Sequence, residues 1–104
     1  DKLIVGIFQP HTFSRTKEFY KDYIKIFKEI NYIYIMDVHP AREKQEDYPE
    51  ITKDIMIKEL SNASSIDIDE YQKLINYDNT VYFFMSPNDI SKLERDLINY
   101  KNAS

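Results

Sequence analysis

The 104-residue sequence predicts an α/β fold, a Rossmann-like three-layer domain with a mostly parallel sheet, on two observations. First, apolar segments of strand length alternate along the chain with segments whose apolar residues recur at the helical period. Second, 42% of the residues are hydrophobic, and 9 Tyr and 6 Phe supply enough bulk for one core. This alternation is typical of a parallel sheet covered by helices on both faces, with right-handed crossovers. The length fits a single domain.

Four segments are expected to form strands. Residues 3–8 are a near-continuous apolar run, which suits a strand buried on both faces. Residues 32–38 and 80–85 are rich in aromatic and apolar side chains, and the second of these is the clearest strand prediction of the chain. Residues 65–68 are expected to form a short strand at the edge of the sheet.

The first predicted helix covers residues 14–30, with Ser14 as its N-cap, because a serine hydroxyl can accept a hydrogen bond from a free N–H of the first turn. Its apolar stripe consists of Tyr20, Tyr23, Ile24, Phe27 and Ile30. The second predicted helix opens at Pro49 and Glu50 and ends in the polar stretch 61–65. The apolar residues that it carries are Ile51, Ile55 and Leu60.

Two further helices are expected in the second half of the chain. Residues 69–77 predict a short helix with Asp69 as its N-cap. The residues that it packs inward are Tyr71 and Leu74. Residues 86–89 combine a serine, a proline and an acid three residues after the serine, which predicts a capping box that opens the final helix. Residues 102–104 are expected to fray. The apolar face of this helix consists of Ile90, Leu93, Leu97 and Ile98.

Composition excludes several classes of function. Eighteen acidic and fourteen basic residues give a net charge of −4, the wrong sign for a general binder of the phosphate backbone of nucleic acids. Without cysteine the chain forms neither a thiolate zinc site nor a catalytic thiol. Gly6 is the one glycine and lies inside a predicted strand. The chain therefore has no glycine-rich loop to hold a nucleotide phosphate.

The sequence also bears on localisation. We find no apolar run of membrane-spanning length and no basic region followed by an apolar secretory segment. We therefore expect a cytoplasmic protein that binds neither membrane nor nucleic acid. The chain starts at Asp1 and enters a strand almost at once, which suggests a piece of a longer polypeptide.

Ligands of open α/β sheets bind beyond the carboxyl ends of the strands, so the segments that follow strands are candidate sites. We call residues 8–16, Phe-Gln-Pro-His-Thr-Phe-Ser-Arg-Thr, the first motif. It brings an imidazole (His11), hydroxyls and a guanidinium (Arg15) to a helix N-terminus, where backbone N–H groups and the helix dipole favour an anion. Arg15 could clamp a carboxylate or phosphate with two hydrogen bonds. The alternative is an ordinary surface loop with a capped helix.

Two more motifs follow predicted strands. The second motif, residues 37–43 (Asp-Val-His-Pro-Ala-Arg-Glu), is interpreted as structural, with an ion pair between Arg42 and Glu43 that shapes the loop. The third motif, residues 86–89 (Ser-Pro-Asn-Asp), is interpreted as a helix cap that could also contact a ligand. A metal site at the two histidines has little support, because such pairs arise easily by chance. No set of nucleophile, base and orienting residue is visible.

The first and second motifs, with the amphipathic helix between them, resemble the carboxyl-terminal domain of the Mur ligases, and among these the ligases that join L-alanine to UDP-N-acetylmuramate in peptidoglycan precursor synthesis. The similarity spans residues 3–100, and its first motif is specific. The resemblance implies a larger ATP-dependent enzyme whose UDP-sugar and ATPase domains are absent from this chain. In the family the muramoyl carboxylate is activated as an acyl phosphate, and the amine of L-alanine attacks it.

The resemblance also implies roles for individual residues. His11 and Arg15 match the family's histidine and arginine that face the substrate, and we expect them to bind L-alanine or the nascent carboxylate. Many members have an arginine where this chain has Thr12, and a glycine-rich turn where it has Ser86 and Asn88. These three are further candidate substrate-binding residues, and no catalytic residue or metal ligand is assigned. ATP and Mg²⁺ are expected mainly on the absent central domain, so that this domain alone is inactive.

Two alternatives stay open. The chain could be a stand-alone Rossmann-like binding or interaction module without a catalytic role, whose Tyr-rich surface serves a protein partner. It could also be the lid domain of a Mur ligase that adds another amino acid. A Gly-x-x-Gly-Lys-Thr/Ser type loop encoded upstream of Asp1 would separate the ligase from the stand-alone module.

Overall fold

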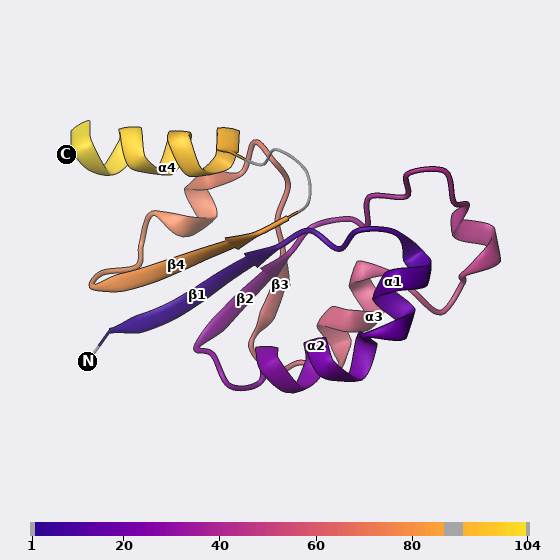
Figure 1. Cartoon of the computed structure of the whole chain (residues 1–104). Coiled ribbons are helices and arrows are strands. Elements are labelled where there is room, and N and C mark those ends of the chain that lie inside the picture. Colours follow the sequence, from indigo (N-terminus) through magenta and orange to yellow (C-terminus); the bar gives the residue numbers. More distant parts are fainter. Residues whose placement is uncertain (1, 87–90, 104) are drawn as a thin grey trace.

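A computed structural model describes residues 2–86 and 91–103, and a four-stranded parallel sheet forms its centre. The strand order is β3-β2-β1-β4, and every neighbouring pair is parallel. The four strands are β1 (Leu3–Phe8), β2 (Tyr32–Ile35), β3 (Ala63–Ser65) and β4 (Thr80–Met85) (Figure 1). Their carboxyl ends therefore meet at one edge of the sheet, the edge where open α/β sheets bind ligands. The predicted α/β fold is confirmed.

Helices cover both faces of the sheet. On one face lie α1 (Phe13–Glu18), α2 (Tyr20–Phe27) and α3 (Lys53–Lys58). The opposite face carries the 3-10 helix η2 (Tyr71–Leu74) and α4 (Ser91–Ala103) (Figure 1). A further 3-10 helix, η1 (Gln45–Asp47), lies in the connection between β2 and α3. This three-layer arrangement is the Rossmann-like architecture that the alternation of segments predicts.

Each layer boundary has its own apolar cluster, because side chains alternate between the faces of a strand. The cluster under α2 and α3 consists of Phe8, Ile24, Phe27, Ile33, Ile35, Met56 and Leu60. The cluster under η2 and α4 consists of Val5, Ile7, Tyr34, Met36, Ile66, Leu74, Leu93 and Leu97. Gly6 lies where a Cβ would come within 2.8 Å of the Ile33 side chain and 3.0 Å of that of Ile30. This crowding under α2 accounts for a glycine inside a buried strand.

The predicted helix over residues 14–30 is wrong in its bounds, because the structure divides it into α1 and α2 and ends α2 at Phe27. Phe19, between the two helices, has φ −103° and ψ 14°, outside the helical range. The carbonyl groups of Phe27 and Ile30 accept hydrogen bonds from the Asn62 side chain, at 3.0 and 2.9 Å. This side chain replaces the backbone donors that a longer helix would need. The predicted apolar stripe itself is confirmed, since all five of its residues belong to or pack against the cluster under α2.

The second predicted helix begins later than expected, at Lys53 rather than at Pro49. The Gln45 side chain donates to the carbonyls of Tyr48 and Ile51, at 2.9 and 3.0 Å, and so holds this stretch as a turn. Thr52 is the N-cap, and its hydroxyl accepts from the Ile55 N–H.

Two strand predictions are also corrected. β2 ends at Ile35 instead of residue 38, because its neighbour β1 ends at Phe8, just before Pro10, which has no N–H for a ladder. The short strand β3 lies at the sheet edge as predicted, but it covers Ala63–Ser65 instead of residues 65–68.

In the second half of the chain, η2 replaces the predicted helix over residues 69–77, and its N-cap position is held by Glu70, not Asp69. The Asp69 carboxylate instead pairs with Lys92 of α4 at 3.0 Å. Within α4, Leu93 and Leu97 are buried as predicted, whereas Ile98 is 49% exposed. The helix continues through Ala103, so the predicted fraying of residues 102 and 103 is wrong. Ile90 and most of the predicted capping box lie outside the described residues.

Candidate functional site

The backbone joins the first and second motifs directly. His11 and His39 form an isolated parallel bridge: the His39 N–H donates to the Pro10 carbonyl, and the Thr12 N–H donates to the His39 carbonyl, both at 2.8 Å. The two imidazole rings are stacked with centroids 5.7 Å apart and planes 11° apart. Segments 28 residues apart in the sequence therefore meet beyond the carboxyl ends of β1 and β2.

Thr12, and not Ser14, is the N-cap of α1, which corrects the sequence prediction. Its hydroxyl accepts a hydrogen bond from the Arg15 N–H at 3.2 Å. The Thr12 backbone has φ 57° and ψ 149°, a region that residues other than glycine rarely enter. Such a conformation costs on the order of 1–3 kcal/mol and persists only where neighbouring contacts enforce it. Here His39 supplies part of that enforcement through the Thr12 N–H.

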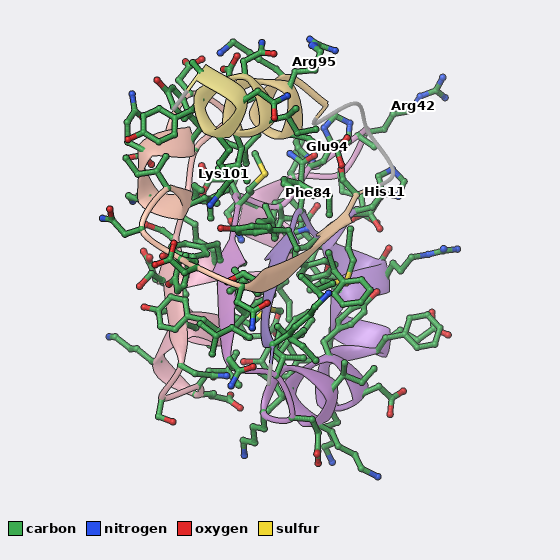
Figure 2. The ribbon with its side chains drawn as sticks, turned by 90° about the vertical axis from the view of Figure 1, so that its left-hand side faces the viewer. His11, Arg42, Phe84, Glu94, Arg95 and Lys101 are labelled. Carbon is green, nitrogen blue, oxygen red and sulfur yellow. The ribbon has the colours of Figure 1, made fainter. Side chains whose placement is uncertain are left out.

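Glu43 holds the two residues that follow Thr12, and its contacts overturn the predicted ion pair with Arg42. One carboxylate oxygen of Glu43 accepts from the N–H groups of Phe13 (2.6 Å) and Ser14 (3.0 Å), and the other accepts from the Ser14 hydroxyl. No Arg42–Glu43 ion pair occurs in the described part of the chain, and Arg42 extends away from the ribbon (Figure 2). The physical reason is that free N–H groups at a helix start attract a carboxylate more specifically than a solvated guanidinium does.

This contact changes the expected chemistry of the first motif. Glu43 occupies the N–H groups of Phe13 and Ser14, and Thr12 occupies that of Arg15. The backbone N–H groups that were expected to bind an external anion therefore already have acceptors inside the protein. These hydrogen bonds, first of all that of the Ser14 hydroxyl, lower the pKa of Glu43, so it is a carboxylate at neutral pH. Any anion bound here would depend on side chains.

The structure does bring the side chains of the first motif together. His11, Thr12, Ser14, Arg15 and Glu18 line a hollow of about 370 Å³, which we call the motif hollow. The Arg15 guanidinium is exposed and has neither a hydrogen bond nor an ion pair within residues 2–86 and 91–103. A guanidinium of this kind can bind a carboxylate or phosphate with two parallel hydrogen bonds. The neighbouring His11 imidazole adds a second nitrogen-bearing group.

The third motif reaches the first through Ser86. Its hydroxyl donates to the side-chain oxygen of Gln9 at 3.0 Å, and the Gln9 N–H donates to the Met85 carbonyl at 3.0 Å. Ser86 therefore lies at the same sheet edge as the first motif, as the order of β1 and β4 requires. The other candidate of the third motif, Asn88, and the rest of the predicted cap lie outside the described residues.

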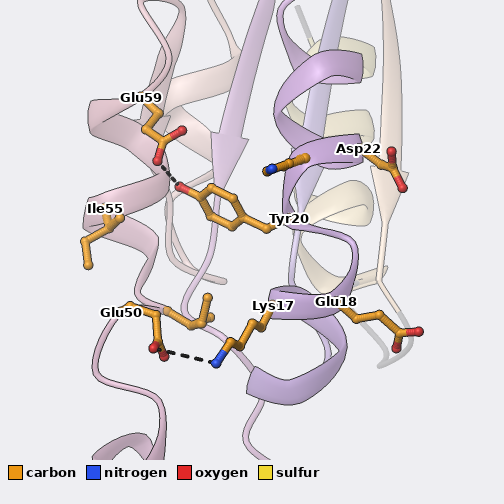
Figure 3. A pocket seen from close by; sticks show the side chains of 9 residues that line it. Lys17, Glu18, Tyr20, Asp22, Glu50, Ile55 and Glu59 are labelled. Carbon is orange, nitrogen blue, oxygen red and sulfur yellow. Dashed lines mark hydrogen bonds and ion pairs between the residues drawn. The ribbon is translucent and has the colours of Figure 1, made fainter.

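A second and larger hollow lies away from the strand ends. This helix groove, of about 660 Å³, runs between α1 and α2 on one side and α3 with its preceding turn on the other (Figure 3). Two pairs of side chains bridge it: the Tyr20 hydroxyl donates to Glu59 at 2.9 Å, and Lys17 lies 3.8 Å from Glu50. Burial, with the contact to Glu59 as a second cause, raises the pKa of Tyr20 to about 12. The residues that line the helix groove are Lys17, Glu18, Tyr20, Lys21, Asp22, Glu50, Ile51, Ile55 and Glu59.

Among the described residues, no group of three or more His, Cys, Asp or Glu side chains could hold a metal ion. The stacked His11 and His39 rings are not joined by a third such ligand there. Gly6 is enclosed in β1 beneath α2 and cannot admit a phosphate. In the described part of the chain, no helix is long and apolar enough to cross a membrane.

Sequence reasoning missed Glu43 as a partner of the first motif. An acid 30 positions after Phe13 has no local signal for such a contact, because helix caps are recognised from residues within the same turn. Only the position of Glu43 after a strand neighbouring β1 hinted that the two motifs would meet. The Tyr20–Glu59 bridge was missed for the same reason, since 39 positions separate its residues.

Comparison with known proteins extends these observations. No protein-family profile matches the chain. It is 39% identical over 95 residues to the UDP-N-acetylmuramate–L-alanine ligase of Lactobacillus acidophilus, which is 90% of this chain and 21% of that enzyme. The like-named enzymes of Lactococcus lactis and Pelodictyon phaeoclathratiforme are 34% and 30% identical over 90% and 96% of this chain. The chain spans about a fifth of the length of these relatives. The resemblance carried by the first and second motifs is confirmed.

Proposed function

We propose that this chain, a homologue of the UDP-N-acetylmuramate–L-alanine ligases of the Mur ligase family, is the carboxyl-terminal, amino-acid-side domain of such an enzyme. Residues 1–104 form a single Rossmann-like domain in this proposal, and UDP-sugar and ATPase domains lie elsewhere in the polypeptide. The observation that carries it is similarity to these ligases over nine tenths of the chain. The exposed Arg15 in the motif hollow supports it from the chemical side.

In this proposal the motif hollow binds the incoming L-alanine or the nascent carboxylate. The amino acid carries a carboxylate that suits a guanidinium, while its amine must stay free to attack the activated muramoyl carboxylate. Arg15 holds the carboxylate with two hydrogen bonds, and His11 borders the same space. The hydroxyls of Thr12 and Ser86 are additional substrate contacts in this proposal, and Asn88, outside the described residues, stays a further candidate.

The activating chemistry belongs to other parts of the enzyme. Because the described residues offer neither a phosphate loop nor a metal-ligand cluster, we assign ATP and Mg²⁺ to the central domain. The muramoyl carboxylate would be activated there as an acyl phosphate. This domain closes over the central domain, positions the amino acid and excludes water. Positioning and water exclusion lower the activation barrier of the attack on the acyl phosphate, although the domain supplies no catalytic group. On this basis the enzyme is cytoplasmic and the isolated domain is inactive.

The test is phosphate release from ATP and UDP-N-acetylmuramate by the full-length polypeptide, with L-alanine varied. Arg15→Ala should lower kcat/KM for L-alanine by about tenfold or more, which equals about 1.4 kcal/mol of transition-state stabilisation. Arg15→Lys should keep part of the activity, because lysine keeps the charge but loses the two-pronged geometry. Lys25→Ala, an exposed cation of α2 outside the motif hollow, is the matched control and should behave as the wild type.

Each other outcome separates the alternatives. Release that depends on a different amino acid would identify the lid of a Mur ligase with other specificity. Absence of release with every amino acid would favour a binding module without catalytic role. Full activity of Arg15→Ala beside an active wild type would keep the ligase and remove Arg15 from the substrate site.

A further inference from the structure

We infer that Glu43 is a positioning residue that holds the segment from His11 to Arg15 in the shape that receives the amino acid. The inference rests on the proposed function and adds to it a residue of the second motif that contacts no substrate itself. Its basis is the set of three hydrogen bonds by which one carboxylate fixes the first turn of α1.

The contact is long-range and involves both carboxylate oxygens. One oxygen accepts from two consecutive N–H groups, those of Phe13 and Ser14, and the other accepts from the Ser14 hydroxyl. Because the same turn donates three hydrogen bonds to one planar group, its orientation relative to the second motif is defined. Arg15 is the next residue along the chain, so the direction of its side chain follows from the turn that Glu43 holds.

The segment needs such an outside restraint. α1 has only six residues, and a helix this short is not stable by itself. Thr12, at the start of this helix, has a positive φ that local preference disfavours. The backbone bridge through His39 holds the chain before Thr12, and Glu43 holds the chain after it. Loss of Glu43 would release one of these two attachments.

The Glu43 carboxylate accepts hydrogen bonds from Phe13 and Ser14 and does not pair with Arg15. No ion pair between Glu43 and Arg15 occurs among residues 2–86 and 91–103. The carboxylate can therefore fix the backbone beside Arg15 while the guanidinium stays available to a substrate anion. An aspartate at this position would be one methylene shorter and would not reach the same donors without movement of the second motif.

Steady-state kinetics of the full-length polypeptide test the functional part. Glu43→Ala should raise the KM for L-alanine by roughly tenfold to a hundredfold, with the KM for ATP unchanged, because misplaced binding groups affect the ligand that they hold. Glu43→Gln keeps the shape and one carbonyl acceptor, so its KM for L-alanine should stay within about threefold of the wild type. The remaining rise is expected because a neutral acceptor forms weaker hydrogen bonds than a charged one. Glu46→Ala removes an exposed acid of η1 for which the described part of the chain shows no ion pair or side-chain hydrogen bond, and should match the wild type.

Hydrogen exchange on the same proteins tests the geometric part without activity. The amides of Phe13 and Ser14 should exchange at least about tenfold faster in Glu43→Ala than in the wild type or in Glu46→Ala. Amides of β1, such as that of Ile7, should keep their protection in all variants and so report that the sheet is intact.

The outcomes divide cleanly. Faster exchange at Phe13 and Ser14 together with a raised KM for L-alanine supports the inference. Faster exchange with an unchanged KM overturns the positioning role and leaves Glu43 as a helix cap, and unchanged exchange overturns the contact itself. A wild type without any L-alanine-dependent activity refutes the proposed function, and the positioning role falls with it even if exchange confirms the contact.

Discussion

The motif hollow and the helix groove differ in what their side chains are bonded to. The helix groove is the larger of the two, about 660 against 370 Å³, yet its Lys17 is paired with Glu50 and its Tyr20 with Glu59. In the motif hollow, the Thr12 hydroxyl accepts from the Arg15 N–H and the Ser14 hydroxyl donates to Glu43, while the Arg15 guanidinium has no partner in the described structure.

The two hollows differ in what a ligand could gain there, which their volumes do not express. Side chains that satisfy one another across a groove stabilise the fold and leave little for a ligand to gain, because each new contact must replace an existing one. The Arg15 guanidinium, by contrast, has no contact in the described structure that a ligand would have to replace. The motif hollow also lies beyond the carboxyl ends of the strands, where this class of sheet binds ligands, whereas the helix groove lies between helices.

The largest expected difference between the motif hollow and the helix groove concerns two threonine caps. Thr12 caps α1 at the motif hollow, and Thr52 caps α3 beside the helix groove. Thr12→Ala and Thr52→Ala should each lose about 0.5–2 kcal/mol of stability, since both remove a cap. Thr12→Gly should in addition relieve the strained backbone at φ 57°, whereas Thr52, at φ −134°, has no strain to relieve. The gap between the Gly and Ala variants should be larger at Thr12 by about 1 kcal/mol or more. Denaturant unfolding of the four variants measures it, and equal gaps at both positions would show that Thr12 is unstrained.

A smaller effect is expected from alkali, and it belongs to the helix groove. The pKa of Tyr20 is raised from 10.0 to about 12, so the folded state keeps the phenol proton after the unfolded state has lost it. Stability from this group is therefore complete below pH 10 and is lost as the pH rises from 10 towards 12. In Glu59→Gln the pKa of Tyr20 should fall only partly, because burial is the larger cause.

Ultraviolet titration of tyrosinate, taken as the difference from Tyr20→Phe, measures this shift. Tyr20→Phe should also show a shallower loss of stability between pH 10 and 12 than the wild type. An ordinary pKa for Tyr20 in the folded protein would mean that in solution its hydroxyl is neither buried nor bonded to Glu59.

The smallest effect is expected at Lys17. Its ion pair with Glu50 is exposed, with more than half of each side chain accessible, and such pairs contribute about 0–1 kcal/mol. Lys17→Ala should leave the KM for L-alanine unchanged within about twofold, in contrast to Arg15→Ala only two positions away. A rise in KM as large as that of the Arg15 variant would place the substrate in the helix groove and reverse the comparison.

Much of the fold could be predicted from local patterns. β1 and β4 have the predicted bounds because each is a continuous apolar run between clear breaks, and the stripe from Tyr20 to Ile30 faces the sheet as its period requires. The errors lie at helix starts: Ser14, Pro49 and Asp69 each have the chemistry of a helix start, but Thr12, Thr52 and Glu70 hold these positions. Local rules rank the possible caps, and contacts with Glu43, Gln45 and Lys92 decide among them.

The sequence by itself determined the α/β class and the mostly parallel sheet, and it carries the motif with His11 and Arg15 at the sheet edge where we expect a site. These properties depend on periodicity and on residue types within short stretches, which the chain displays without folding. Only the tertiary structure decided that His39 and Glu43 hold that motif and that the N–H groups of α1 are already occupied. The physical reason is that these contacts join residues about 30 positions apart, which become neighbours only when β1 and β2 pair.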